Sequence, residues 1–137
     1  MKQRTIKKIE CVKGYQGIFF DKKVADSLRR TALDLAPLTN NERVIGDIHV
    51  TFNYGELVDM PTGECTVRIV GFGANGKNTG FKVELPDSVK QYFKMEIPHI
   101  TVSCVKTGEP KDTAKLKFVS CKEFELTGKF KNIIFDN

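Results

Sequence analysis

The chain has 137 residues, of which 40% are hydrophobic and 28% charged, and it carries a net charge of +5 at neutral pH. This length fits one compact domain, and the balance of residues excludes a disordered or fibrous chain. The mild positive charge is compatible with a phosphate-bearing ligand, although many proteins with the same charge bind none.

The first third of the chain predicts two short strands and a helix. Residues 5–12 and 17–20 contain apolar residues in the pattern of short strands. Asp21 is a typical N-cap residue, and apolar residues recur at helical spacing after it. We therefore expect an amphipathic helix over residues 22–36, which ends before the next proline.

A polar loop at residues 39–42 leads into a predicted strand at residues 45–54. In this strand Ile48, Val50 and Phe52 alternate with polar residues, so these three side chains are expected in the core. The polar positions between them are left on the opposite face.

The second half predicts more strands and a short helix. Residues 65–72 and 81–85 have strand patterns, and the Asn75-Gly76 turn between them favours a hairpin. Residues 86–93 predict a short helix that begins at a proline. In the C-terminal third, residues 115–135 predict two strands around Thr127-Gly128.

The protein has only two histidines, and each is followed two residues later by threonine. The first motif is Ile48-His49-Val50-Thr51-Phe52, and the second is Pro98-His99-Ile100-Thr101-Val102. Side chains two residues apart on a strand share a face, so each motif presents one imidazole and one hydroxyl together. A helix precedes each motif strand, which predicts a repeat of pattern in the two halves of the chain.

Two imidazoles and two hydroxyls suit phosphoryl transfer without a metal. A neutral imidazole accepts a proton from the attacking water or hydroxyl, and a protonated one donates to the departing oxygen. Threonine hydroxyls donate hydrogen bonds to the phosphate oxygens on which charge concentrates. We therefore predict that His49 and His99 are catalytic and that Thr51 and Thr101 bind phosphate. The near-symmetric motifs do not distinguish the acid from the base.

These two motifs resemble those of the 2H phosphoesterase superfamily, and the segment Ile97-Pro98-His99-Ile100-Thr101-Val102 is especially similar to its second motif. That superfamily includes 2′,5′-RNA ligase-like proteins, cyclic phosphodiesterases of tRNA repair, and viral and phage enzymes that degrade oligonucleotide signals. The resemblance implies an α+β, bilobal fold with two helices, in which antiparallel sheets from two pseudo-repeated lobes surround a central groove. It implies a single domain over residues 1–137, with motifs at 49–51 and 99–101.

Several residues have competing interpretations. His49, His99 and Cys104 are an alternative set of zinc ligands, although no short ligand pair supports them. Three aromatic residues are candidates to stack a base, with core packing favoured for the first and third: Phe52, Tyr54 and Phe72. Three loop lysines either attract phosphate or form solvated surface: Lys77, Lys106 and Lys111.

Cysteine usage and the N-terminus bear on the compartment. No two of the four cysteines, Cys11, Cys65, Cys104 and Cys121, are spaced as a Cys-x-x-Cys pair. The first residues are basic and do not have the apolar core of a signal peptide, and no apolar run has membrane-spanning length. These features predict a cytoplasmic protein with reduced thiols and no membrane contact.

Together these features predict a metal-independent phosphodiesterase that needs no cofactor. The expected substrate is a cyclic or 2′-linked phosphodiester, either at an RNA end or in a cyclic oligonucleotide second messenger. By analogy, the small size favours a viral or phage-type protein that blunts an immune signal. Two alternatives stay open: a non-catalytic RNA- or nucleotide-binding module, and an RNA-repair 2′,3′-cyclic phosphodiesterase or ligase.

Overall fold

The computed structural model describes residues 12–36, 42–105 and 109–135. Its strands are β1 (Lys13–Phe19), β2 (Glu42–Val44), β3 (His49–Glu56), β4 (Glu64–Ala74), β5 (Asn78–Glu84), β6 (His99–Val105) and β7 (Val119–Ile134). Most of the predicted strand 5–12, most of the predicted loop 39–42, Cys11 and Lys106 lie outside the described residues.

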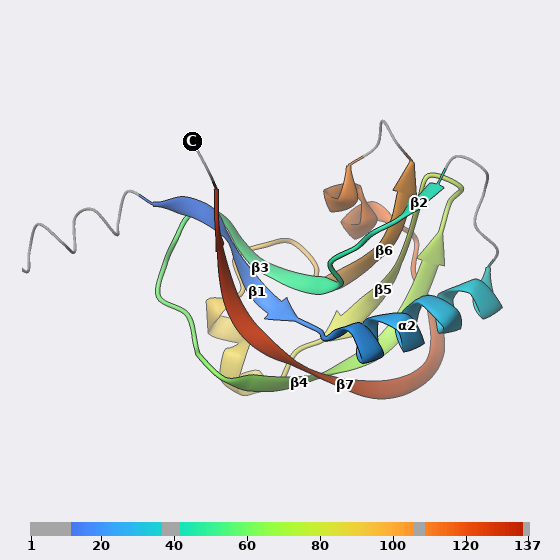
Figure 1. Ribbon diagram of the computed structural model, residues 1–137. Helices are drawn as coiled ribbons and strands as arrows, with labels where there is room; N and C mark the ends of the chain where they lie inside the picture. Colours follow the sequence, from blue (N-terminus) through green and yellow to red (C-terminus); the bar gives the residue numbers. More distant parts are fainter. Residues whose placement is uncertain (1–11, 37–41, 106–108, 136–137) are drawn as a thin grey trace, which may run out of the picture.

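Six of these strands close into one antiparallel barrel (Figure 1). The order around it is β1, β3, β6, β5, β4 and β7, and β7 pairs again with β1. β2 pairs with the C-terminal part of β6, beyond the point where β3 leaves it. The seam between β3 and β6 is short, since Val50 and Ile100 form its backbone pair.

The predicted bilobal fold, with two lobes around a central groove, is wrong. β7 pairs with β1 along one part of its length and with β4 along another, and it therefore joins the two halves into one sheet. Each barrel strand has a neighbour on both sides, which removes the free edges that two separate sheets would expose. Apolar side chains from both halves, among them Ile18, Val50, Phe81 and Ile100, meet in a single core cluster.

One of the two predicted helices is a substantial α-helix. It is α2 (Lys22–Leu35), and Asp21 caps it by accepting a hydrogen bond of 2.9 Å from the Val24 amide, as the N-cap pattern predicts. The apolar face of α2, formed by Ala25, Leu28 and Ala32, is buried in the core. Among the described residues, no helix has both the length and the apolar character needed to cross a bilayer.

The predicted helix at 86–93 is the short 3-10 segment η1 (Asp87–Tyr92). A second 3-10 segment, η2 (Pro110–Lys115), lies over β6 and β5 (Figure 1). A helical segment lies between a strand and the motif strand in both halves, as β5–η1–β6 and as β1–α2–β2–β3, where the short β2 is inserted, although the two halves share one barrel.

The predicted pair of strands within residues 115–135 is also wrong, because β7 is one long curved strand. Gly128 lies in its interior rather than in a turn. A Cβ at this position would lie 2.6 Å from the Phe19 carbonyl oxygen and 2.7 Å from Ile18 Cγ2. The glycine permits a close approach of β1 to β7, which a sequence pattern does not distinguish from a turn.

The alternation in the motif strands is confirmed from Ile48 to Phe52 and around Ile100, and it ends at the register irregularities, beyond which Asn53 and Ser103 are buried. Ile48, Val50, Phe52 and Ile100 have exposed fractions of 1%, 0%, 0% and 0%. Full burial of each such side chain stabilises the fold by about 1.5–3 kcal/mol. The core therefore fixes which face of each motif strand carries the histidine and the threonine.

Candidate active site

The four motif side chains lie on one face of the adjoining strands β3 and β6. The pairing of Val50 with Ile100, extended by one residue in each direction, places His49 opposite Thr101 and Thr51 opposite His99. The histidines then occupy diagonal positions, which are about 7–8 Å apart in an antiparallel pair. Burial is the main cause of the lowered pKa of His49, and the charge of His99 lowers it further, which agrees with this proximity. We call this surface the histidine face.

The backbone around the two motifs is repeated. On β1, Gly17 lies opposite Thr51, and on β5, Gly80 lies opposite Thr101. Each glycine follows an irregularity in the register, at Gln16/Gly17 and at Thr79/Gly80. Such irregularities re-aim the side chains of the strand beside them.

Both glycines are required by close packing. A Cβ on Gly17 would collide with the carbonyl oxygen of Val50, and a Cβ on Gly80 would collide with that of Ile100. These two carbonyls belong to the central residues of the two motifs. The same backbone arrangement therefore supports each His-x-Thr segment.

Both histidine rings are held in the same way. His49 Nδ1 lies 2.9 Å from the Asp47 carbonyl oxygen, and His99 Nδ1 lies 2.7 Å from that of Ile97. A carbonyl only accepts hydrogen bonds, so Nδ1 of each neutral ring carries the proton and Nε2 carries the lone pair. Nε2 is then the nitrogen available for proton transfer in both rings.

The surroundings of His49 are aromatic and acidic. Its ring stacks on Phe19 at 4.8 Å and 12°, and it contacts Tyr15 at 5.5 Å. Burial lowers the pKa of His49, while the hydrogen bond to the Asp47 carbonyl and the charge of the Asp47 carboxylate act in the opposite direction. Burial and Asp47 together raise the pKa of Tyr15, so this carboxylate acts on both rings.

The surroundings of His99 differ. The residue opposite it on β5 is the exposed Lys82 rather than an aromatic residue. Burial lowers the pKa of His99, opposed by the hydrogen bond to the Ile97 carbonyl, and no carboxylate contributes. The Asp47 carboxylate therefore favours a protonated imidazole at His49, and no carboxylate acts in this way at His99.

The two threonines also differ. Thr101 Oγ1 lies 2.9 Å from the Pro110 carbonyl oxygen and 2.8 Å from Thr113 Oγ1, both in η2. A hydroxyl has one proton, so when Thr101 donates it to the Pro110 carbonyl, none is left for a ligand. Thr113 Oγ1 also accepts a hydrogen bond of 3.1 Å from the Asn78 side-chain amide. In the part of the chain that the structure describes, Thr51 Oγ1 has no hydrogen-bond partner. Thr51 is thus the motif hydroxyl that is ready to meet a ligand.

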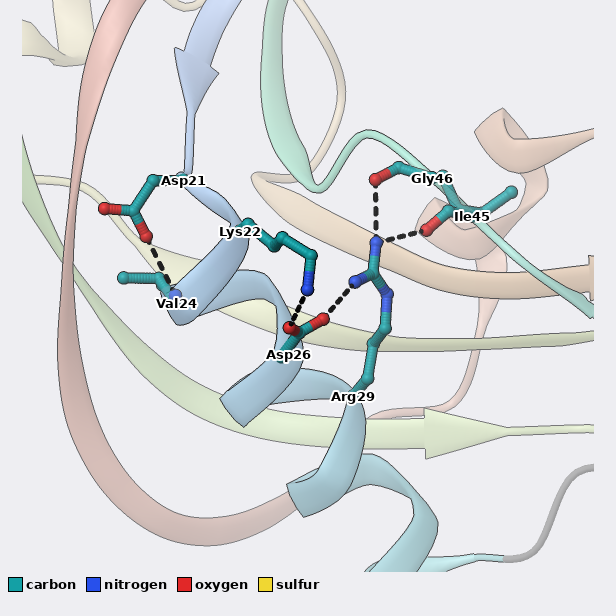
Figure 2. A network of polar contacts seen from close by, with 7 residues as sticks. All are labelled: Asp21, Lys22, Val24, Asp26, Arg29, Ile45 and Gly46. Carbon is teal, nitrogen blue, oxygen red and sulfur yellow. Dashed lines mark hydrogen bonds and ion pairs between the residues drawn. The ribbon is translucent and has the colours of Figure 1, made fainter.

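A side chain of α2 holds the backbone segment that leads into His49. The Ile45 amide donates to the Val102 carbonyl at 2.8 Å, so residues 46–49 bulge out between this bond and the Val50 pair. Figure 2 shows Arg29 donating to the carbonyls of Ile45, at 2.9 Å, and Gly46, at 2.7 Å. The same guanidinium pairs with Asp26 at 2.9 Å (Figure 2). Arg29 therefore ties the helix to the bulge that presents the Asp47 carbonyl to His49.

Positive charge flanks the histidine face on both sides. Lys82 lies on β5, and on β7 Lys129 and Lys131 lie opposite Phe19 and Gly17. All three lysines are exposed. They favour an anionic ligand over this surface, with Asp47 as the nearby negative charge.

The alternative residues have clear positions. Cys104 is 3% exposed and lies opposite Asn78 on β5, beyond the register irregularity that follows Thr101. No cluster of three or more metal-ligating side chains occurs among residues 12–36, 42–105 and 109–135. Phe52 and Phe72 are buried in the core, whereas Tyr54 is 66% exposed. Lys77 is exposed in the hairpin turn, and Lys111 pairs with Glu109 at 3.0 Å.

Two hollows on the surface of the described residues have no histidine in their lining. One is lined by Gln16, Val58 and neighbouring residues. The other lies between β5 and η1 and includes Lys82 and Pro98 at the border of the histidine face.

The sequence reasoning missed the residues that surround the motifs. They are Tyr15, Phe19, Asp47, Arg29, Gly17, Gly80, Asn78 and Thr113. The only local signal was the occurrence of a glycine before an apolar residue in two strands, Gly17-Ile18 and Gly80-Phe81. No protein-family model matches the sequence, and no curated protein is significantly similar to it.

Proposed function

We propose that the protein is a metal-independent phosphodiesterase that uses His49 and His99 as its acid–base pair. Its substrate is a cyclic or 2′-linked phosphodiester of an RNA end or of a cyclic oligonucleotide. The observation that carries the proposal is the matched hydrogen bond from Nδ1 of each ring to the carbonyl two residues earlier. Two structural histidines with unrelated roles give no reason for this match.

In the proposed reaction, Nε2 of His99 takes a proton from the attacking water. The water oxygen bonds to phosphorus, and the ester P–O bond on the opposite side breaks. Nε2 of protonated His49 gives its proton to the leaving oxygen. The assignment of His49 as the acid rests on the Asp47 carboxylate, which favours its charged form.

Thr51 is the proposed donor to a non-bridging phosphate oxygen, since its hydroxyl is available. The lysines that flank the histidine face attract the phosphate before reaction. Thr101, the other predicted phosphate ligand, contributes in this scheme by holding η2 against β6.

The engagement of Thr101 also favours a second candidate, a nucleotide-binding module without turnover. Its hydroxyl donates to Pro110 or Thr113, so one of the two motif hydroxyls is unavailable to a phosphate in this arrangement. A binding module needs the basic, aromatic surface but does not need both imidazoles.

The test is hydrolysis of a substrate panel in excess EDTA. The panel contains 2′,3′-cyclic mononucleotides, 2′,5′-linked dinucleotides and cyclic di- and trinucleotides, which separates RNA-end from messenger substrates. His49→Gln and His99→Gln are each expected to lower kcat by on the order of 10²–10⁴. Lys23→Gln, on the exposed side of α2, is the control for substitution itself.

Three results would count against the proposal. Nucleotide binding without turnover of any member of the panel would support the binding module. Activity lost in EDTA and restored by a metal would contradict metal independence. Turnover retained in both histidine variants, with the fold checked by circular dichroism, would remove the histidines from the chemistry.

A further inference from the structure

An aromatic patch adjoins the histidine face at the end of β1 and β3. It consists of Tyr15, Tyr54 and Phe135, whose rings contact one another. Tyr15 and Tyr54 stack with centroids 6.5 Å apart and planes at 21°, and Phe135 lies 5.3 Å from Tyr54 and 6.0 Å from Tyr15. Tyr54 is 66% exposed, so its side chain is accessible at the surface of this cluster.

The patch is continuous with the proposed catalytic pair. Tyr15 contacts the His49 ring at 5.5 Å, so Tyr54 is separated from His49 by one intervening ring. Tyr15 and Tyr54 face each other in the β1–β3 register, next to the irregularity beside Thr51. A phosphate at the histidine face therefore lies beside an exposed ring.

Positive charge is also close to the patch. The hydrogen bond to Glu109 is the main cause of the raised pKa of Lys111, on η2. An electrostatic interaction with the Tyr54 side chain raises this pKa further. On the other side, Lys131 lies two residues along β7 from Ile133, which faces Tyr15. An exposed ring flanked by lysines and adjoining a phosphate site is the arrangement that binds an unpaired nucleobase.

We propose that Tyr54, supported by Tyr15 and Phe135, is a stacking platform for the base of the nucleotide whose phosphate lies between His49 and His99. This inference rests on the proposed phosphodiesterase site and narrows its substrate to nucleotides with an unpaired base. Base stacking tolerates all four bases, because every base has a π face. The platform therefore gives affinity for nucleotides rather than preference for one base.

The absence of tryptophan from the chain provides a direct test. In Tyr54→Trp the single indole reports on the platform, and titration with AMP is expected to quench its fluorescence to saturation. Ribose 5-phosphate, which has the phosphate without the base, is expected to leave the fluorescence unchanged. Val119→Trp, at a position 60% exposed on β7, is the matched control and is expected to show no saturable quenching.

A second measurement uses the unlabelled protein. Calorimetric affinity for AMP is expected to fall about 5- to 100-fold in Tyr54→Ala, the range of one base–aromatic stack. Tyr54→Phe keeps the ring and is expected to retain most of the affinity. Equal affinity of wild type and Tyr54→Ala for AMP, or equal quenching of Tyr54→Trp by AMP and ribose 5-phosphate, would overturn the platform.

The same titration in a His49→Gln/His99→Gln background separates this inference from the catalytic proposal. Binding of AMP to Tyr54 does not need proton transfer, so quenching of Tyr54→Trp should persist there. Quenching of Tyr54→Trp by AMP, with no turnover by the wild type, would support the stacking platform and contradict the proposed phosphodiesterase activity. Turnover by the wild type with no effect of Tyr54→Ala on AMP affinity would support the enzyme and contradict the stacking platform.

Discussion

The two halves of the histidine face have the same backbone and different neighbours. In both halves, a glycine lies opposite the motif threonine, and the histidine Nδ1 bonds to the carbonyl two residues earlier. Around His49, however, lie Phe19, Tyr15 and Asp47, whereas His99 lies opposite Lys82. The shared backbone makes two equivalent imidazoles, and the unlike neighbours give them unequal charge preferences, which acid–base catalysis requires.

The largest expected effects come from the two glycines that support the shared backbone of the histidine face. Gly17→Ala is expected to lower the free energy of unfolding by about 3 kcal/mol, because the new Cβ collides with a backbone carbonyl that cannot turn away. Gly80→Ala is expected to cost less, because its Cβ would lie 2.5 Å from the Ile100 carbonyl oxygen, farther than a Cβ on Gly17 would lie from that of Val50. Urea unfolding measures both.

Gly46→Ala is the control for these glycine variants, since a Cβ there meets nothing within 4 Å. If Gly17→Ala unfolds at the same urea concentration as Gly46→Ala, close packing is not the reason for the glycine beside the motif.

Arg29 supports only the His49 half, and its loss should weaken that half alone. Arg29→Met leaves the carbonyls of Ile45 and Gly46 without their donor, which is expected to cost about 1–3 kcal/mol of stability. Activity is expected to fall about tenfold, because the backbone segment that orients His49 becomes more mobile and the ring is held less well in position for proton transfer. Imidazole nitrogen chemical shifts in NMR should change for His49 and not for His99.

Arg30→Met is the matched control, because Arg30 is the next residue on α2 and is exposed. Equal changes at both histidines in Arg29→Met would mean that the arginine supports the whole barrel rather than one half of the site.

The threonines should separate chemistry from structure. Thr51→Val is expected to lower kcat about tenfold with little change in stability, since it removes one hydrogen bond to a phosphate oxygen. Thr101→Val is expected to lower stability by about 1 kcal/mol, since it removes the bond to Pro110 or Thr113. A larger loss of stability in Thr51→Val than in Thr101→Val would reverse these two roles.

The smallest effect concerns pH. Burial lowers the pKa of both imidazoles below 6.5, so the free enzyme with one protonated and one neutral ring is most abundant below pH 6.5. Therefore kcat/KM should be bell-shaped and should fall as the pH rises above 6.5, because the acid loses its proton. Asp47→Asn removes the charge that favours protonated His49, so this alkaline limb should move to lower pH.

Movement of the acidic limb instead would assign His49 as the base. The stability of the fold has its own pH dependence: the unfolded chain binds more protons at these histidines, so stability should fall as the pH falls below 6.5. Asp34→Asn, far along α2, controls for the loss of one negative charge.

The sequence by itself determined the local structure and the motif residues. Helical spacing and an N-cap at Asp21 were enough for α2, and strict alternation was enough to place Val50 and Ile100 in the core and the histidines on the opposite face. These features are local, since they depend on residues within one turn or one strand. The cytoplasmic location, the phosphodiesterase activity and the superfamily resemblance stay predictions.

Only the tertiary structure decided how the strands are joined. Strand pairing brings together residues far apart in the chain, and the alternation of β7 is the same whether it is one strand or two. The barrel therefore replaced the predicted lobes, and it brought Tyr15, Phe19 and Arg29 to His49 from earlier elements and η2 to Thr101 from a later one. A period-two pattern defines which face a side chain occupies, whereas its neighbours on that face are set by register, which only long-range packing fixes.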